Sequence, residues 1–177
     1  MRNEIIAALP ELNLIQDAAL RDKVIAVWTE SLQTGGFSVD EMKQVPFAVL
    51  GDQPSITLLE RVRAVCHTCT AIADSLLASY GKRITINRDV LVAGALLADV
   101  GKFLEYERRK DGTLRKAPRG ELLRHPFTGV GLAFRQGLPV EVMHIIAVHS
   151  KEGDHVRRST EAIIYHHADF TNFELVR

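Results

Sequence analysis

The sequence has little cysteine and no excess charge of either sign. Two cysteines, Cys66 and Cys69, are too few and too close together to cross-link a secreted domain, and no secretory signal segment precedes them. The 177 residues carry 22 basic and 22 acidic side chains, whereas proteins that bind nucleic acid phosphates or anionic membranes normally have a basic excess. We therefore expect a cytoplasmic protein whose partners include neither a nucleic acid polymer nor a membrane.

Long apolar runs are also missing. The longest one, Val90–Ala98, is far shorter than the ~20 residues that a membrane-spanning helix needs. Apolar residues instead recur at helical spacing along most of the chain, without a convincing run of strict alternation. This pattern predicts an all-α fold, a compact bundle of about six helices. Val90–Ala98 is apolar on every side, which predicts that its helix is fully enclosed at the centre of the bundle.

Capping residues and helix breakers predict where the helices begin and end. Ser55 and Asn87 are the expected N-caps of the second and third helices. A polar loop or small hairpin is expected after the third helix, because Asp111-Gly112 favours a tight turn. The predicted helices cover residues 14–33, 55–80, 87–106, 126–136, 139–150 and the segment from 159 or 160 onward, with a looser stretch around Pro46, Gly51 and Pro54.

All seven histidines lie at or after position 67, so any histidine-based site belongs to the second and later helices. His67 lies roughly opposite the apolar stripe that runs from Leu58 to Leu76 on its helix. Its position alone therefore also fits a histidine that simply faces solvent. His149 lies on an apolar helix face and is expected to point inward, whereas His144 is expected at the surface.

Two carboxylates stand in apolar surroundings. Asp99 ends the longest apolar run, and a buried carboxylate needs a cation, a metal or several hydrogen-bond donors. An ion pair with Lys102, three residues along the same helix face, would satisfy Asp99 without a metal. In the last helix, Asp169 shares a face with His166 and again points toward apolar neighbours.

Five segments together resemble the HD superfamily of metal-dependent phosphohydrolases. In chain order they are 65–68 (VCHT), 94–102 (GALLADVGK), 125–129 (HPFTG), 145–149 (IIAVH) and 164–169 (IYHHAD). The resemblance covers about residues 55–172. It implies a metal-binding domain over 55–177, with residues 1–54 as a helical extension packed on it. The metal ligands that it implies are His67, Asp99, His125, His149 and Asp169.

The chain departs from the family pattern at one position, because Ala98 replaces the histidine of the family's His-Asp pair. Five of the six ligands of a two-metal site remain, including Asp99, which would bridge the two ions. Water, substrate or His166 can fill the missing position, and these alternatives stay open. A mixed set of imidazoles and carboxylates suits iron, manganese, zinc or similar divalent ions. We expect one or two such ions.

The resemblance implies hydrolysis of a small phosphorylated compound, a nucleotide or a phosphodiester, by metal-activated water. Asp99 and Lys102 are the expected catalytic residues, since Lys102 can neutralise charge that develops on a phosphate. The segment 108–124 is basic, and its Arg119 and Arg124 are expected to bind the anionic substrate together with Lys102. A solvated loop without a ligand is the alternative for this segment.

Other functions also remain open. An HD-type enzyme can hydrolyse or oxidise a non-phosphate molecule, and a domain with a degenerate site can serve as a non-catalytic regulatory or binding module. Cys66 and Cys69 are expected to be buried structural cysteines. The N-terminal helix can cap the bundle or form the contact of a homo-oligomer through its apolar residues Ile15, Leu20, Ile25 and Trp28.

Overall fold

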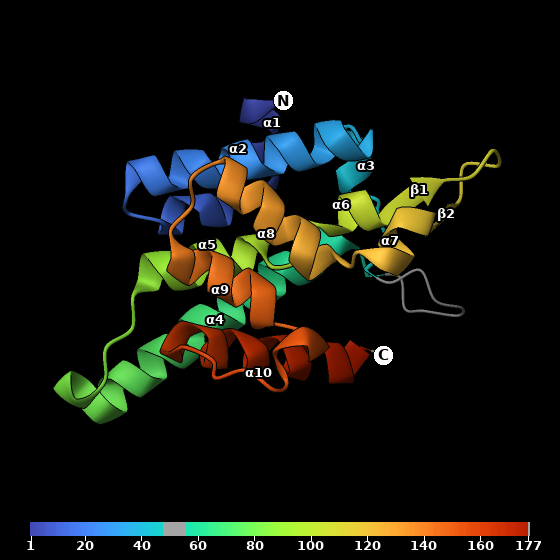
Figure 1. The fold of residues 1–177 in the computed structure, drawn as a ribbon. Coiled ribbons are helices and arrows are strands. Elements are labelled where there is room, and N and C mark those ends of the chain that lie inside the picture. Colours follow the sequence, from blue (N-terminus) through green and yellow to red (C-terminus); the bar gives the residue numbers. More distant parts are fainter. Residues whose placement is uncertain (48–55, 177) are drawn as a thin grey trace.

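The computed structural model describes residues 1–47 and 56–176, and helices make up nearly all of their regular structure (Figure 1). This confirms the predicted all-α class. A short antiparallel hairpin joins strands β1 (Tyr106–Arg108) and β2 (Leu114–Lys116). The helices are α1 (Arg2–Ala8), α2 (Ala18–Gly35), α3 (Val39–Met42), α4 (Leu58–Tyr80), α5 (Arg88–Leu97), α6 (Lys102–Glu105), α7 (Pro118–Leu122), α8 (His125–Arg135), α9 (Val140–Val148) and α10 (Thr160–Val176), with 3₁₀ turns η1 (Pro10–Leu14), η2 (Gly81–Arg83) and η3 (Lys151–Gly153).

Helix α5 lies at the centre of the bundle, between α2 on one side and α4 on the other (Figure 1). All of its residues from Val90 onward are buried, which confirms the enclosed helix predicted from the apolar run. Helix α9 approaches α5 closely at Gly94, where any side chain would overlap Ile145. The side chain of Asn87 caps α5 by accepting a hydrogen bond from the backbone N–H of Val90, as predicted.

The predicted helix over 87–106 is wrong in its second half, because a turn at 98–101 separates α5 from α6. The chain passes so close to α8 at Gly101 that a side chain there would overlap the carbonyl oxygen of His125. The carbonyl oxygen of Val100 accepts a hydrogen bond from Ser31 Oγ at 2.7 Å instead of continuing the helical ladder. Contacts between distant segments therefore override the helical pattern at this point, and they decide where Asp99 points.

The N-terminal region also differs from the single helix predicted over 14–33. It forms α1, the turn η1 that begins at Pro10, and α2, whose N-cap Asp17 accepts hydrogen bonds from the backbone of Ala19 and Leu20. The four apolar residues of the predicted N-terminal contact are buried within the chain, and the ring of Trp28 packs edge-on against Phe103 of α6. The structure therefore uses them to cover the bundle. These residues are Ile15, Leu20, Ile25 and Trp28.

The other boundaries agree with the prediction to within a few residues. The hairpin begins at Tyr106, the last residue of the predicted third helix, and Gly112 lies in its turn at φ 85°. Thr57 caps α4 in a reciprocal pair with Glu60, whereas the predicted cap Ser55 lies outside the described residues, as do Gly51 and Pro54. None of the described helices is both long and apolar enough to cross a membrane.

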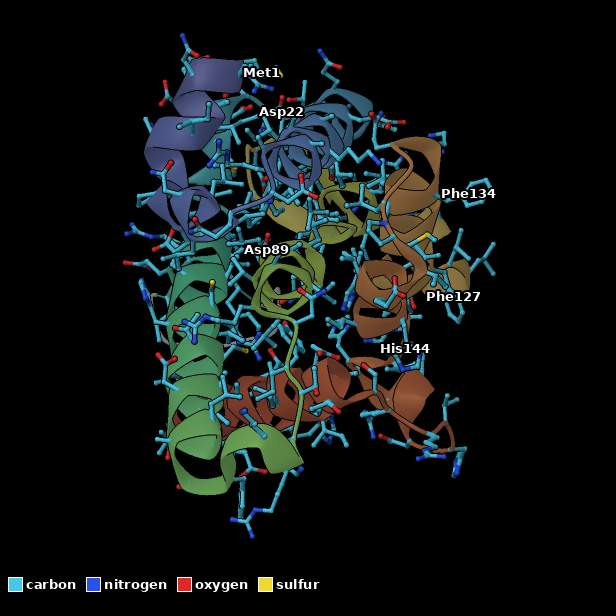
Figure 2. All side chains as sticks on the ribbon, turned by 90° about the vertical axis from the view of Figure 1, so that its left-hand side faces the viewer. Met1, Asp22, Asp89, Phe127, Phe134 and His144 are labelled. Carbon is cyan, nitrogen blue, oxygen red and sulfur yellow. The ribbon has the colours of Figure 1, made fainter. Side chains whose placement is uncertain are left out.

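Helix α8 has one apolar face on the outside of the molecule. Phe127 and Phe134 project away from the bundle (Figure 2) and are 55% and 73% exposed. Leu132 and Ala133 face the core from the other side of the same helix. The core thus uses only one side of α8, and the first residue of this helix, His125, faces the interior.

Candidate metal centre

Three buried side chains from separate elements come together at one end of α5. They are Asp99 in the turn after α5, His125 at the start of α8, and His149 at the end of α9. Each offers one ligand atom, and these atoms all lie within 4.8 Å of one another. Asp99 Oδ1 lies 3.4 Å from Nε2 of His125 and 3.8 Å from Nε2 of His149. The structure thus brings together three of the five ligands that the sequence predicted.

The outer nitrogen of each imidazole is held by an acceptor. His125 Nδ1 lies 2.6 Å from a carboxylate oxygen of Glu105, and His149 Nδ1 lies 2.8 Å from the carbonyl oxygen of Ile146. An ionised Glu105 and a backbone carbonyl can only accept hydrogen bonds, so each histidine donates one from Nδ1–H. In a neutral imidazole the other nitrogen, Nε2, then carries the free lone pair. Metal-binding histidines in proteins are typically oriented by such acceptors.

The two Nε2 atoms face each other at 3.3 Å. Two lone pairs at this distance repel, so the arrangement needs a proton or a metal cation between the rings. Burial lowers the pKa of His149, which disfavours the proton. Burial alone would raise the pKa of Glu105, but its two hydrogen bonds with His125 and the charges of His125 and Lys116 together outweigh this and lower the pKa to about 2. A divalent cation held by Asp99, His125 and His149 fits this donor set.

The second oxygen of Asp99 faces a guanidinium group. Nη1 of Arg61 on α4 lies 3.3 Å from Asp99 Oδ2 and 2.7 Å from Asp169 Oδ1. Arg61 also donates a hydrogen bond from Nη2 to the carbonyl oxygen of Asp169, and the hydroxyl of Tyr165 donates to Asp169 Oδ1. Burial opposes the charge of Arg61, but the two carboxylates raise the pKa of its guanidinium above the ordinary value.

Lys102 contacts Asp99 from a third direction. Its Nζ lies 3.3 Å from Asp99 Oδ1, which is the ion pair that the sequence allowed as an alternative, and it donates a hydrogen bond to the carbonyl oxygen of Phe47. Burial by itself would raise the pKa of Asp99, but Lys102, His125 and Arg61 hold it well below its usual range. Asp99 is therefore ionised at neutral pH, as a metal ligand must be.

These residues line a cavity of about 280 Å³. Its wall carries both the cations Arg61, Lys102 and Arg124 and several aromatic rings. The full lining consists of Phe47, Arg61, Asp99, Lys102, Glu105, Tyr106, Arg124, His125, His149, Ser150, Asp169, Phe170 and Phe173. A small anion that also carries a ring would find both a charged and an aromatic surface there.

His67, a predicted metal ligand, lies outside this cluster. Its side chain is 62% exposed, and its Nε2 lies 2.9 Å from Glu11 Oε1 at the start of the chain. The solvent-facing alternative thus describes His67 better. His166, the suggested substitute ligand, lies beside the cluster, and its Nδ1 is 3.2 Å from the carbonyl oxygen of His149. Asp169 does reach the cavity, but Arg61 is the cation that it contacts.

The two arginines expected to bind substrate have different surroundings. Arg124 lines the cavity and pairs with Glu152 at 2.6 Å. Arg119 is exposed, donates to the carbonyl oxygen of Leu104, and does not line the cavity. Cys66 and Cys69 are free and buried as expected, and burial raises the pKa of the Cys66 thiol to about 12. These thiols are therefore structural rather than reactive.

The sequence reasoning missed Arg61 and Glu105. Arg61 carried a usable signal, because it follows Leu58 by three residues and precedes Val65 by four, which puts a charge on the core-facing side of its helix. Glu105 carried none. Its approach to His125 depends on the turn between α5 and α6, which the helical pattern concealed.

Comparison with known proteins gave a family match and a similar curated protein. A family model described as "HD domain" matches residues 58–171. A curated protein of Methanocaldococcus jannaschii, named dihydroneopterin 2',3'-cyclic phosphate phosphodiesterase, is 33% identical over 162 residues, which is 88% of this chain. The chain spans 63% of that protein's length. No solved structure matches.

Proposed function

The chain belongs to the HD domain family, and on this premise we propose that it is a metal-dependent phosphohydrolase that acts on a small phosphorylated compound. The observation that carries the proposal is the pair of imidazole Nε2 atoms, 3.3 Å apart, that face each other and Asp99 in a cavity with cationic walls. This combination offers a metal-binding donor set and an anion-binding surface in one place.

Asp99, His125 and His149 would hold the metal ion, with iron, manganese and zinc as the candidates. When bound, such an ion supplies hydroxide near neutral pH and polarises a phosphoryl oxygen. Glu105 and the carbonyl oxygen of Ile146 fix the two rings, so that both Nε2 atoms stay directed at the same point.

Lys102 and Arg124 would bind the phosphate group. Both are cations in the cavity wall, and the buried position of Lys102 strengthens its attraction for an anion. The rings of Phe47, Phe170 and Phe173 would contact the organic part of the substrate. Because the related Methanocaldococcus protein is named as a 2',3'-cyclic phosphate phosphodiesterase, cyclic phosphodiesters of ring-bearing compounds are the substrates to test first.

Metal analysis and hydrolysis assays together test the proposal. The purified protein should contain a transition metal, and should hydrolyse members of a panel that contains phosphomonoesters, linear phosphodiesters and 2',3'-cyclic phosphodiesters. His149→Ala should lose the metal and the activity together, because it removes one of two imidazole ligands. His144→Ala, on the same helix but outside the cavity, is the matched control. A protein that neither contains nor takes up a divalent metal would contradict the proposal.

A further inference from the structure

The strongest unexplained feature of the site is Arg61, a buried arginine between two carboxylates that sequence and family resemblance assign to metals. Asp99 and Asp169 were both expected as metal ligands, and the guanidinium of Arg61 contacts each of them. We propose that Arg61 takes the place of a second cation, so that this site binds a single metal ion. The inference rests on the metal site proposed above and concerns its stoichiometry.

The two oxygens of Asp99 are already divided between different partners. Oδ1 faces Lys102 and the two imidazoles, whereas Oδ2 faces Nη1 of Arg61. A carboxylate that bridges two metal ions needs both oxygens free for metal. Among the described residues, imidazole nitrogens lie only beside Oδ1, so only that side can complete a metal site.

Arg61 is held in place by more than its two carboxylates. Its side chain is 5% exposed, and its guanidinium carbon lies 4.0 Å from the centre of the Phe47 ring. Nη2 donates a hydrogen bond to the backbone carbonyl oxygen of Asp169, so the guanidinium contacts the main chain of α10 as well as the side chain of Asp169. A guanidinium stays charged throughout the physiological pH range. It is therefore a permanent cation at this position.

The charge balance of the cavity agrees with one ion rather than two. Its buried charged side chains are three carboxylates and two cations, which leaves one negative charge in excess. The third cation of the wall, Arg124, is only partly buried and is already paired with Glu152. One divalent ion converts this excess into a single positive charge, which suits a phosphate substrate. A second divalent ion beside Arg61 would leave three positive charges in a buried space, which is strongly unfavourable. The carboxylates are Asp99, Glu105 and Asp169, and the cations are Arg61 and Lys102.

Asp169 then has a positioning role. Its carboxylate accepts hydrogen bonds from Arg61 and from the hydroxyl of Tyr165, and it keeps the guanidinium directed at Asp99. Removing the charge of Arg61 should free Asp169 Oδ1 and Asp99 Oδ2 together. Those oxygens form the beginning of a second cation site, and Arg61→His would add an imidazole to it.

Metal stoichiometry tests this inference without an activity assay. Metal-free protein is titrated with Mn²⁺ and with Zn²⁺ by isothermal calorimetry, and bound metal is measured by equilibrium dialysis. Wild-type protein should bind one ion per chain. Arg61→His should bind two, and the added ion should disappear in the double variant Arg61→His, Asp169→Asn. Arg88→His is the matched control, because Arg88 also pairs with a carboxylate, Asp74 of α4, away from the cavity. It should bind one ion.

Asp169→Asn alone gives an independent test if Arg61→His does not fold. Because Asp169 is not a ligand of the single ion, this variant should keep one ion with an affinity within about threefold of wild type. Two ions in the wild-type protein, one ion in a folded Arg61→His variant, or loss of the ion in Asp169→Asn would each overturn the role of Arg61. Wild-type protein that binds no ion would instead contradict the proposed metal site itself.

Discussion

The two sides of Asp99 differ in how they neutralise its charge. On the imidazole side, formed by His125, His149 and Glu105, Oδ1 meets two neutral rings that are oriented by their own acceptors. On the guanidinium side, formed by Arg61 and Asp169, Oδ2 meets a permanent cation. Neutral bases leave room for an exchangeable cation, whereas an arginine supplies the cation from the chain itself. One carboxylate can thus serve a metal and a structural ion pair at once.

Asp99→Asn should have the largest effect, because Asp99 belongs to both sides. We expect loss of bound metal and a fall in hydrolytic activity of about 10²–10³-fold. Arg61 and Lys102 would lose a buried partner, which should lower the free energy of unfolding by about 3–5 kcal/mol. Metal analysis, steady-state kinetics and urea denaturation measure the three effects.

Asp74→Asn is the control for this variant, since Asp74 is an exposed partner of Arg88. Its change in the free energy of unfolding should be below about 1 kcal/mol. Equal destabilisation by the two variants would show that the buried network around Asp99 contributes no more than a surface ion pair.

Glu105→Gln should weaken the imidazole side alone. The variant keeps the shape of the side chain but removes the carboxylate that fixes Nδ1–H of His125, so metal affinity should fall by about 10–100-fold. Competition with a chromophoric chelator gives the affinity. Glu121→Gln, at an exposed position in α7, is the control. An unchanged affinity in Glu105→Gln would show that the charge of Glu105 is not needed to orient His125.

Acidification should weaken the imidazole side in two phases. Burial lowers the pKa of His149 below the 6.5 that is ordinary for histidine, so the unfolded chain takes up this proton more readily than the folded protein does. The associated stability is present above pH 6.5 and is lost as the pH falls through the lower folded pKa.

Protons also compete with metal for Nε2, so bound metal should be released over the same acidic range. The contribution of Glu105 to the stability of the fold is retained until lower pH. Its pKa falls from 4.5 to about 2 on folding, so this contribution is lost only as the pH falls between these two values. Metal content and the thermal midpoint, measured between pH 8 and pH 3, follow the two phases. Metal retention that stays constant down to pH 4 would contradict an imidazole-bound ion.

His67→Ala should have the smallest effect. His67 belongs to neither side of Asp99, and its side chain is largely exposed where it contacts Glu11. We expect unchanged metal content and a loss of unfolding free energy of about 0–1 kcal/mol. The same measurements on His125→Ala should show loss of metal. If His67→Ala also loses metal, the ligand set implied by family resemblance is right and the one drawn from the structure is incomplete.

Local patterns predicted much of the fold. The helix over 90–98 is apolar on every side, and only a fully enclosed helix can bury such a surface. Asn87 caps this helix as expected, and Asp111-Gly112 forms the turn of the hairpin. These features depend on neighbours a few residues away in the chain, so short-range physical rules suffice.

The ligand geometry depended on contacts between distant segments. Helical periodicity assigns a residue to a face of its own helix, but it does not say which turn of that helix lies level with a carboxylate on another helix. Arg61 illustrates this limit, because periodicity places it on the core-facing side of α4, but only the structure shows that its turn lies level with Asp99. The turn before α6, forced by the close approach of Gly101 to α8, brings Glu105 to His125.

The sequence by itself determined the helical class and the enclosed central helix. It also indicated that Asp99 and His149 point inward, and its resemblance to the family added His125 as a candidate metal ligand. Only the tertiary structure decided which groups surround them. The physical reason is that a buried charge is stabilised by whatever reaches it in space. Arg61 of α4 and Lys102 of α6 contact Asp99 directly, and Asp169 of α10 acts through Arg61, although these residues are far apart in the chain.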